Sequence, residues 1–550
     1  METRLGVFHE ERMSPVFSTD GLHIAYVINH NDKQLVVTDG KPEPEYDRIR
    51  ELDDSEYRLV FSPDGSHLAY DALKGNKWLV VLDGAEGSEY DDIGEVDFSP
   101  NGTHLAYDAR RGKKWVAVVD REEGTEYDAV SALVFSPDGS RVAFSARNGD
   151  KWLVVVDGEP GPEYDNTGIP IFSPDSSRVG YEAETGGKTL VVVDGEPGPE
   201  YDLVGSGLVF GPDGRRFAYA AKKGRKWVVV ADGEPGPEYK LAGSPVFTSD
   251  SRHLVYEAKN DDGAFVVVDG KTGPVFDTIQ MGGPVVSPDG NHIAYTAFRK
   301  GKMVVVVDGE PGPDYDNIHE FGPVLSPDGS RVAYAAQKGT KWAAVVNGEQ
   351  GPAYDRVDTP VSSPDGGRVA YRAAKARIWS AKPKWLVVAD GRPESEYDEV
   401  YGRPVFSRNG RRVGYAARKG KKSVVVVDGK PGPKHDAIAK GSLVFSQDEE
   451  HWSYSAWNAG KMLVVLDGQP GPVYDGIGES GLGRTPDSSR EAETSWRDIH
   501  YTVVGGRPGP GFLDLPNGPV FHPDETLEYL AVKDGCLYRV THVPGERADG

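Results

Sequence analysis

The sequence predicts an all-β protein built from repeated units, and three observations lead to this class. Gly (68) and Pro (40) together make up close to 20% of the 550 residues, whereas average usage is about 12%, and both residues break helices. A turn motif of the form Phe-Ser-Pro-Asp-Gly recurs along the whole chain. Valine-rich apolar runs recur with it, so the chain has enough apolar surface to form packed strands rather than to remain disordered.

The turn motif sets the expected number of units. Its Asp or Asn lies at Asp20, Asp64, Asn101, Asp138, Asp175, Asp213, Asp250, Asp289, Asp328, Asp365, Asn409, Asp448, Asp487 and Asp524. A fixed period of about 39 residues is typical of stacked supersecondary units. Many units of four short strands indicate the blades of a β-propeller. We therefore expect fourteen four-stranded blades.

Every repeat has the same anatomy, which residues 169–202 illustrate. A short apolar strand precedes the turn Ser173-Pro174-Asp175, in which Pro presets φ for a type I turn. A second strand of alternating character follows at 178–181. The third strand, 190–193, is continuously apolar and is expected to be buried on both faces. A short fourth strand near Tyr201, flanked by Pro, suits a sheet edge.

The aromatic residues follow the same period. Twelve of the 26 tyrosines lie on second strands, and ten precede the Asp, or its equivalent, of a fourth-strand Tyr-Asp pair. Tryptophans begin third strands at Trp78, Trp115, Trp152, Trp227, Trp342 and Trp385, each after a Lys. Such residues could be stacking platforms for a ligand. We interpret them instead as packing between blades, because a residue present in every repeat is a structural element first.

The motif Phe-Ser-Pro-Asp-Gly-Ser-Arg-Val-Ala-Phe at 135–144 and its relatives resemble the WD40-like PD40 repeat of the TolB-type β-propellers. The resemblance covers nearly the whole chain, implies the propeller fold and says almost nothing about function. The Gly-His and Trp-Asp signatures of true WD40 repeats are missing. The prolyl oligopeptidase family also carries such blades, attached to a hydrolase domain, and this chain has no residues left over for one.

The chain ends indicate how rings would close. The sequence begins with a fourth-type strand near Phe8 and ends with three strands, so a strand from earlier in the chain is expected to complete a final blade. Since rings usually have 4 to 8 blades, we expect two seven-bladed propellers in tandem, residues 1–271 and 272–550. The strand near Phe8 would then complete the blade that ends near Gly270, and the strand at 275–276 would complete the fourteenth. A single large ring or an unequal split, such as six plus eight, are the alternatives.

Catalytic and metal-binding patterns are sparse. The single cysteine, Cys536, excludes a disulfide framework and cysteine-based zinc sites. The sequence has no His-Glu-x-x-His motif, no Walker A loop and no EF-hand loop. The segment 478–481, Gly-Glu-Ser-Gly, only partly resembles a nucleophile elbow, and the 13 histidines show no metal-ligand spacing. We predict no catalytic residue, no metal site and no cofactor.

Charge and hydropathy limit the classes of partner. A net charge of -24 argues against global attraction to nucleic acid or anionic lipid, and no motif signals specific nucleic-acid recognition. No stretch approaches 18 apolar residues, so we expect no membrane span. Residues 1–13 lack the apolar core of a signal peptide. A cytoplasmic location is the default expectation.

The loops differ in charge according to their position in the repeat. Loops between second and third strands are basic, and include Lys74, Lys77, Arg110, Arg111, Lys113, Lys114, Lys222, Lys223, Arg225, Lys226, Arg299, Lys300, Lys302, Lys338, Lys341, Arg418, Lys419, Lys421 and Lys422. Loops between third and fourth strands are acidic, as at Asp157, Glu159 and Glu163. In a propeller these loops lie on opposite faces, which predicts an anion-binding face. The alternative is that duplicated blades copied surface charges that maintain solubility.

One loop departs from the repeat pattern and is the best single candidate for a binding site. Residues 375–384 are longer than the equivalent loops and carry Arg377, Trp379, Lys382 and Lys384. Insertions in repeats usually mark the binding face, and Trp with Arg is a hot-spot composition. The alternative is a longer solvated loop with Trp379 folded onto its own blade. The extension at 48–58 is a weaker candidate, since it would also serve as a longer crossover.

These observations predict a non-enzymatic scaffold that binds a protein or peptide through its loop faces or the channel of the propeller. The basic loops add the possibility of an anionic ligand. The alternatives are a carbohydrate- or polyanion-binding module, or an enzyme that uses the mouth of the channel. An enzyme would need polar residues unique to a few blades, whereas the sequence mainly offers repeated ones.

Overall fold

The structure is a computed structural model that describes residues 2–7, 16–18, 23–52, 57–131, 133–280, 282–377, 380–445, 451–470, 483–484, 491–495, 500–504, 507–512, 520–521, 527–533 and 536–542. The chain divides into two compact units. Unit 1 comprises Met1–Glu238 with Glu528–Thr541, and unit 2 comprises Tyr239–Leu527 with His542–Gly550.

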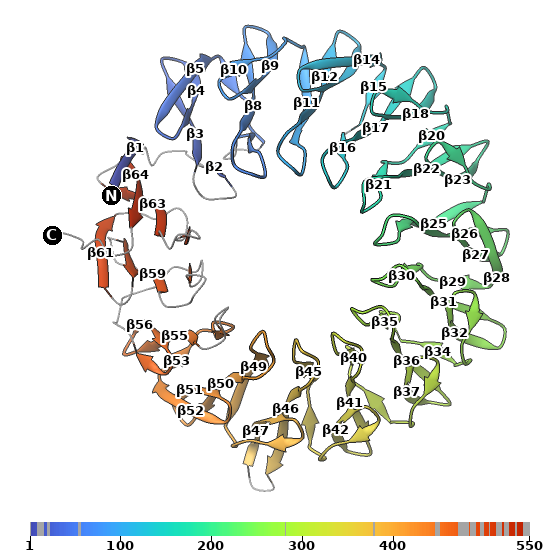
Figure 1. The fold of residues 1–550 in the computed structure, drawn as a ribbon, viewed down its shortest axis with the longest axis vertical. Coiled ribbons are helices and arrows are strands. Elements are labelled where there is room, and N and C mark those ends of the chain that lie inside the picture. Colours follow the sequence, from blue (N-terminus) through green and yellow to red (C-terminus); the bar gives the residue numbers. More distant parts are fainter. Residues whose placement is uncertain are drawn as a thin grey trace. The chain divides into compact units, whose positions relative to one another are not determined.

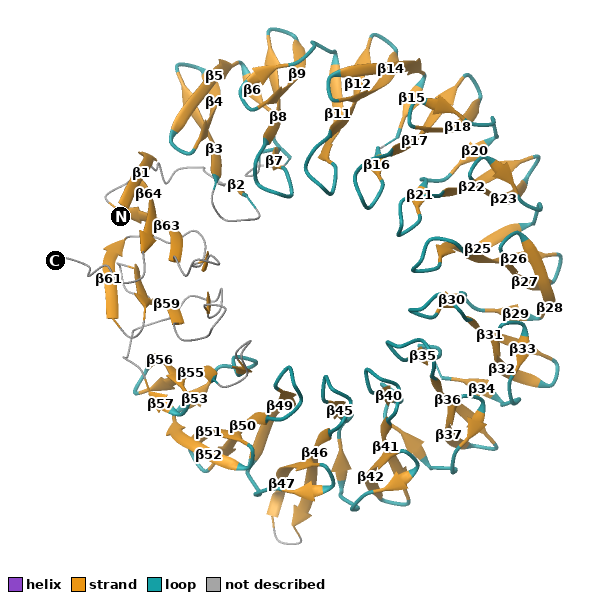
Figure 2. Cartoon of the chain, viewed as in Figure 1, coloured by secondary structure: helices purple, strands orange, loops and turns teal. Residues whose placement is uncertain are grey.

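The described residues are all-β and include no helix, as Figure 2 shows. Their strands form fourteen antiparallel sheets of four or five strands, a form that fits propeller blades. None of the described residues belongs to a helix that could cross a membrane. The arrangement of the sheets as rings and the boundary at residue 271 stay predictions.

Each sheet is centred on two long strands, which correspond to the second and third strands of the repeat (Figure 1). The second strands are β3 (Ile24–His30), β8 (Leu68–Lys74), β12 (Leu105–Arg111), β17 (Val142–Asn148), β22 (Val179–Thr185), β26 (Phe217–Lys223), β31 (Leu254–Asn260), β36 (Ile293–Arg299), β41 (Val332–Lys338), β46 (Val369–Arg377), β50 (Val413–Lys419), β55 (Trp452–Asn458), β59 (Glu491–Ser495) and β63 (Leu527–Lys533). The third strands are β4 (Lys33–Thr38), β9 (Lys77–Leu82), β13 (Lys114–Val119), β18 (Lys151–Val156), β23 (Lys188–Val193), β27 (Lys226–Ala231), β32 (Gly263–Val268), β37 (Lys302–Val307), β42 (Lys341–Val346), β47 (Ser380–Ala389), β51 (Lys422–Val427), β56 (Lys461–Leu466), β60 (His500–Val504) and β64 (Cys536–His542).

The outer strands are mostly short. In the sheet of β22 and β23, the first-strand side consists of β20 (Asn166–Thr167) and β21 (Ile171–Phe172), and the fourth-strand side is β24 (Glu196–Pro197). An isolated bridge from Thr189 to Tyr201 extends the fourth strand.

Local sequence explains both hairpins of this sheet. Gly186 and Gly187 join β22 to β23 with φ values of +56° and +74°, and Asp194 and Gly195 adopt +53° and +81°. Two successive positive φ values define the type I′ turn, whose twist matches that of paired strands and which favours Gly and Asp. The Asp-Gly pair that recurs after the third strands is therefore a hairpin signal.

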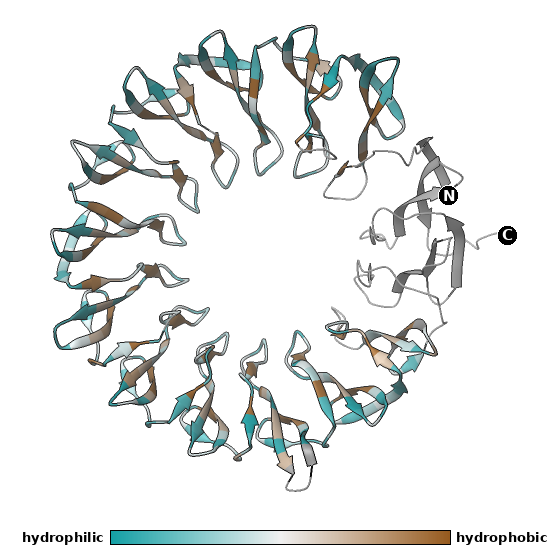
Figure 3. Cartoon of the chain, turned by 180° about the vertical axis from the view of Figure 1, so that it is seen from behind, coloured by the Kyte–Doolittle hydropathy of each residue, from teal (hydrophilic) through white to brown (hydrophobic). Residues whose placement is uncertain are grey.

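The core lies between neighbouring sheets. Residues 190–193 are all buried, which confirms the expectation that the third strand is covered on both faces. Tyr201 and Tyr219, from adjacent repeats, meet edge to face with ring centroids 6.4 Å apart, and both are buried. Figure 3 shows apolar residues concentrated in the strands of the sheets. The repeated tyrosines thus pack one sheet against the next, as predicted.

The pairing of the chain ends differs from the expectation. Strand β1 (Glu2–Val7) pairs antiparallel with β64, so the strand near Phe8 does not complete the sheet that ends near Gly270. That sheet is extended instead by the segment that directly follows it in the chain, because Phe276 and Ala264 exchange two backbone hydrogen bonds of 2.8 Å. The expectation that the strand at 275–276 completes the last blade is therefore wrong. Phe276 thus makes the bridge within its own repeat that the tyrosine of the Tyr-Asp pair makes in other repeats, as Tyr164 does with Trp152.

Candidate binding surface

In most of the described sheets, the lysine that begins the third strand is neutralised by a carboxylate of its own repeat. Lys151, at the start of β18, contacts Asp165 at 2.6 Å. Equivalent Lys-to-Asp ion pairs join Lys77 to Asp91, Lys114 to Asp128, Lys188 to Asp202, Lys302 to Asp316, Lys341 to Asp355, Lys384 to Asp398 and Lys422 to Asp436. The positive charge of the basic loops is thus partly balanced within each sheet.

The carboxylate that pairs with this lysine also binds the next repeat. Asp165 Oδ2 accepts the backbone N–H of Gly186 at 2.7 Å. The same contact from the following hairpin is made to Asp47, Asp91, Asp128, Asp202, Asp277, Asp316, Asp355, Asp398 and Asp436. We call this arrangement the Asp clamp. Lys151 and, secondarily, the Gly186 amide lower the pKa of Asp165 below its usual range.

The hairpin between β26 and β27 departs from this pattern. The residue after Tyr239 is Lys240, not Asp, so the repeat has no clamp carboxylate for Lys226. Within the described ranges, Lys223, Arg225 and Lys226 are exposed and form no ion pair. Lys222, half-buried, helps to lower the pKa of Asp202, after Lys188 and the backbone N–H of Gly224. This loop therefore presents unbalanced positive charge on unit 1.

A second cationic hairpin joins β50 to β51 in unit 2. Lys419 and Lys421 are exposed, and no ion pair of either is found in the described part of the chain. Its neighbour Arg418 contacts Glu399 at 2.7 Å. Lys419 and Lys421 are thus accessible, whereas Lys422 is held in an Asp clamp with Asp436 at 2.8 Å.

Strands β46 and β47 are longer than the equivalent strands of the other repeats. This confirms that the hairpin between them is extended. Arg377 pairs with Ser380 in its backbone register. Trp379 lies outside the described residues, so its role in binding stays a prediction. Lys384 forms an ion pair with Asp398, so it belongs to an Asp clamp. Lys382 is exposed.

The extension at 48–58 carries two arginines that converge on a buried carboxylate. Arg50 forms an ion pair with Asp71, whose side chain is 0% exposed, and Arg58 Nε lies 3.5 Å from the other oxygen of Asp71. Arg50 also stacks over Trp78 at 3.9 Å from the ring centroid. Burial raises the pKa of Asp71, and both guanidinium groups oppose this rise. The arrangement compensates a buried charge within the sheet.

The acidic segments do not form a separate face. Asp157 pairs with Arg141 at 2.8 Å, while Tyr164, at the far end of the same segment, bridges to Trp152. Each segment therefore runs from the Asp-Gly turn back to the basic hairpin, which brings acidic and basic residues together at one end. The sequence did not reveal this course, because the short edge strand lacks a clear alternating pattern.

Histidines also take a repeated structural position. His292 Nδ1 lies 2.8 Å from Asp308, and the same pair is formed by His23, His67, His104, His253 and His451 with Asp39, Asp83, Asp120, Asp269 and Asp467. In other repeats an arginine, such as Arg178, replaces the histidine. Among the described residues no group of three His, Cys, Asp or Glu side chains could hold a metal ion.

The chain matches no protein-family model and no curated protein. Among the solved structures similar to it are an initiation factor and a bacterial TolB. A crystal structure of the eukaryotic initiation factor is 13% identical, with a TM-score of 0.27, and the match covers 61% of this chain and 97% of that one. TolB from Acinetobacter baumannii is 12% identical, with a TM-score of 0.21, and the match covers 47% of this chain and 77% of TolB.

Proposed function

We propose that this chain is a non-enzymatic β-propeller scaffold of the PD40 type that binds an acidic protein or peptide through its cationic hairpins. The observation that carries the proposal is the unbalanced charge of Lys223, Arg225 and Lys226. In most other repeats an Asp clamp neutralises the lysine that begins the third strand, whereas this repeat replaces the clamp carboxylate by Lys240. Exposed cations without carboxylate partners attract acidic ligands and accelerate their association.

A labelled glutamate-rich peptide tests the proposal by fluorescence anisotropy at several salt concentrations. The variant Lys223→Glu/Arg225→Glu should weaken binding at least tenfold, and binding should weaken further as salt screens the charges. Lys113→Glu is the control for a single charge reversal, because Lys113 lies on an exposed hairpin whose repeat retains its clamp carboxylate, Asp128. Equal affinity for the double variant and the wild type would overturn the proposal.

The long hairpin provides a second contact in this proposal. A pull-down with the wild type and an Arg377→Ala/Trp379→Ala variant tests it, since a hot-spot pair should remove most of the recovered partner. Unchanged recovery of the partner would restrict the binding surface to the hairpin of Lys223 and Arg225.

A further inference from the structure

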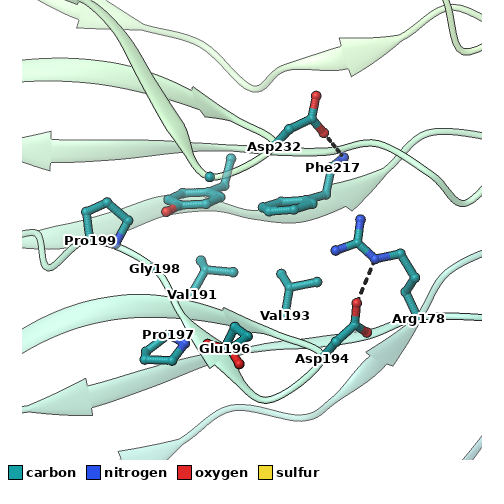
Figure 4. A pocket seen from close by; sticks show the side chains of 12 residues that line it. Arg178, Val191, Val193, Asp194, Glu196, Pro197, Gly198, Pro199, Phe217 and Asp232 are labelled. Carbon is teal, nitrogen blue, oxygen red and sulfur yellow. Dashed lines mark hydrogen bonds and ion pairs between the residues drawn. The ribbon is translucent and has the colours of Figure 1, made fainter.

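A pocket opens between the sheets that contain β23 and β26, both in unit 1 (Figure 4). Its volume is about 570 Å³. Val191 and Val193 line it from β23, and Tyr219 lines it from β26. Phe217, Arg178 and the segment around Gly198 also line it. The pocket therefore combines an apolar wall with a guanidinium group and a phenol.

The phenol of Tyr219 has an unused hydrogen-bond donor. Tyr219 is 1% exposed, and its hydroxyl has no hydrogen-bond partner among the described residues. Burial raises the pKa of Tyr219, so the hydroxyl keeps its proton. A buried donor without an acceptor is costly, and an acceptor that enters the pocket would remove this cost.

Two other repeats place a carboxylate at the equivalent position. Tyr415 and Tyr70 correspond to Tyr219, and they donate hydrogen bonds of 2.7 Å to Glu394 and Glu43. In the sequence, both glutamates stand where the repeat of Tyr219 has Gly198. We call the space beside this tyrosine hydroxyl the niche. In these two repeats the niche holds a carboxylate that the chain itself supplies.

The same backbone hydrogen bond is formed beside the niche of Tyr219 and beside the niche of Tyr415. The N–H of Gly198 donates to Val191 O at 2.9 Å, and the N–H of Glu394 donates to Val387 O at 2.9 Å. A Cβ atom on Gly198 would lie 3.2 Å from the Tyr219 hydroxyl. The absence of a side chain at Gly198 therefore leaves the hydroxyl without the acceptor that Glu394 provides to Tyr415.

A glycine that lines the pocket from the adjacent sheet shows that the pocket and the niches of Glu394 and Glu43 lie at equivalent positions. Gly233 lines the pocket, and its equivalent, Gly429, lies against Glu394, because an added Cβ would be 3.7 Å from the carboxyl carbon. Gly84 has the same relation to Glu43, with 3.6 Å to a carboxylate oxygen. The carboxylates of Glu394 and Glu43 therefore occupy the space that corresponds to the pocket.

The charges around the pocket match those around Glu394 at one position and differ at another. Arg178 corresponds to Arg368, whose positive charge helps to oppose the rise that burial causes in the pKa of Glu394. Of the three acidic side chains that line the pocket, Asp194 contacts Arg178 at 2.8 Å and Asp232 contacts Arg216 at 3.0 Å. The third, Glu196, is exposed, forms no ion pair within the described residues and stands where the repeat of Glu394 has Arg392. An entering carboxylate would meet two paired acids, the exposed Glu196 and an unused phenol donor.

We propose that this pocket binds a carboxylate group, which accepts a hydrogen bond from Tyr219 as Glu394 does from Tyr415. The group is either the side chain of a glutamate in a bound peptide or a small free carboxylic acid. This site goes beyond the proposed function and does not depend on the cationic hairpins.

Methyl NMR of the full chain, labelled at valine, tests the site through Val191 and Val193. The probes are propionate and a Gly-Gly-Glu-Gly-Gly peptide with both ends blocked, and the same peptide with Gln in place of Glu is the control. We expect saturable shifts of both methyl signals with propionate, with the Glu peptide, or with both. A response to propionate alone assigns the site to small acids, and a response to the Glu peptide assigns it to peptides.

Variants separate the carboxylate site from other effects. Tyr219→Phe should weaken binding about tenfold, the loss expected for a hydrogen bond to a charged group. Gly198→Glu should fill the pocket and abolish the shifts. Tyr415→Phe is the matched control, because its niche already contains Glu394. The conservative Tyr219→Phe exchange keeps the test decisive if Gly198→Glu does not fold.

The reverse substitution tests the comparison between repeats. Glu394→Gly should open a second site beside Tyr415, reported by new shifts at Val387 when propionate is added. The proposal would be overturned by the absence of shifts with both probes, by equal binding of the Gln peptide, or by shifts that persist unchanged in Tyr219→Phe. Charge reversal at Lys223 and Arg225 leaves Val191 and Val193 unaltered, so failure of the hairpin proposal is read separately.

Discussion

Asp165 joins two neighbouring sheets, because its Oδ2 accepts the backbone N–H of Gly186 at 2.7 Å. The other oxygen of the carboxylate contacts Lys151 at 2.6 Å. One side chain thus binds the end of its own third strand and the hairpin of the next repeat. Wherever the clamp recurs, a sheet is aligned with its neighbour by a hydrogen bond as well as by apolar packing.

Replacing Asp165 by Ala should loosen this connection. The Gly186 amide would lose its acceptor and become accessible to water, so we expect its hydrogen exchange to accelerate and the melting temperature to fall. Hydrogen exchange followed by mass spectrometry measures the first effect. Glu163→Ala, an exposed change in the same segment, is the control. Unchanged exchange at Gly186 would contradict a linking role of the clamp.

The pair of arginines on Asp71 should be needed for stability. Removing both positive charges in Arg50→Met/Arg58→Met leaves the buried carboxylate uncompensated, which costs about 3–5 kcal/mol in the free energy of unfolding. Urea unfolding measures this loss. Adding Asp71→Leu should recover most of it, since no buried charge then remains. An equally unstable triple variant would show that the arginines act through packing alone.

The turn motif should contribute to stability in acid. The Ser62 hydroxyl, followed by Ser66, lowers the pKa of Asp64 to about 2. A carboxylate with a lowered folded pKa stabilises the protein above its unfolded pKa, near 3.8, and loses this contribution as the pH falls through about 2. The melting temperature of the wild type should therefore fall more between pH 5 and pH 2 than that of Asp64→Asn.

Asp64→Asn is a suitable comparison because another repeat uses asparagine. Ser99 donates to Asn101 Oδ1 at 2.7 Å, so the amide preserves the turn without titrating. Identical pH profiles for Asp64→Asn and the wild type would contradict the stabilising role of the carboxylate.

The His292 pair should show the opposite pH dependence. Its hydrogen bond to Asp308 raises the pKa of His292. The stabilisation is complete below the ordinary pKa of 6.5 and is lost as the pH rises through the raised folded pKa. NMR titration of the imidazole should therefore give a midpoint above 6.5.

Substituting arginine separates charge from geometry at this position. Arg178 makes the equivalent contact with Asp194 at 2.8 Å and keeps its charge at all ordinary pH values. The melting temperature of His292→Arg should therefore decline less than that of the wild type above pH 7. Parallel declines of the two proteins would show that protonation of His292 does not stabilise the fold.

Much of the local structure was predictable from the sequence, because the strands and turns depend on nearby residues. The Asp-Gly pairs adopt the positive φ values of hairpin turns, and the valine runs form the buried third strands. The repeat also predicted that tyrosines such as Tyr201 and Tyr219 pack between blades, and the structure shows that these two rings meet edge to face. Repetition turns a local pattern into a packing rule, because each sheet meets a similar neighbour.

The binding surface was predictable only in part. Lys223, Arg225, Lys419 and Lys421 are exposed as expected, but the neutralisation of Lys384 by Asp398 depends on residues 14 apart that meet only when the third and fourth strands pair. In the sequence the Tyr-Asp pairs mark only the fourth strands. The clamp and, with it, the special position of Lys226 are visible only in the folded structure.

By itself, the sequence determined the all-β class, the repeated unit and the positions of its turns, since these follow from the preferences of neighbouring residues. Only the tertiary structure decided that β1 pairs with β64 and that Phe276 bridges to Ala264. It also decided that Tyr219 borders a pocket, whereas Tyr415, at the equivalent position of another repeat, donates a hydrogen bond to Glu394. Edge pairing and inter-sheet contacts join residues far apart in the chain. Similar repeats offer several equivalent partners, and the folded arrangement selects among them.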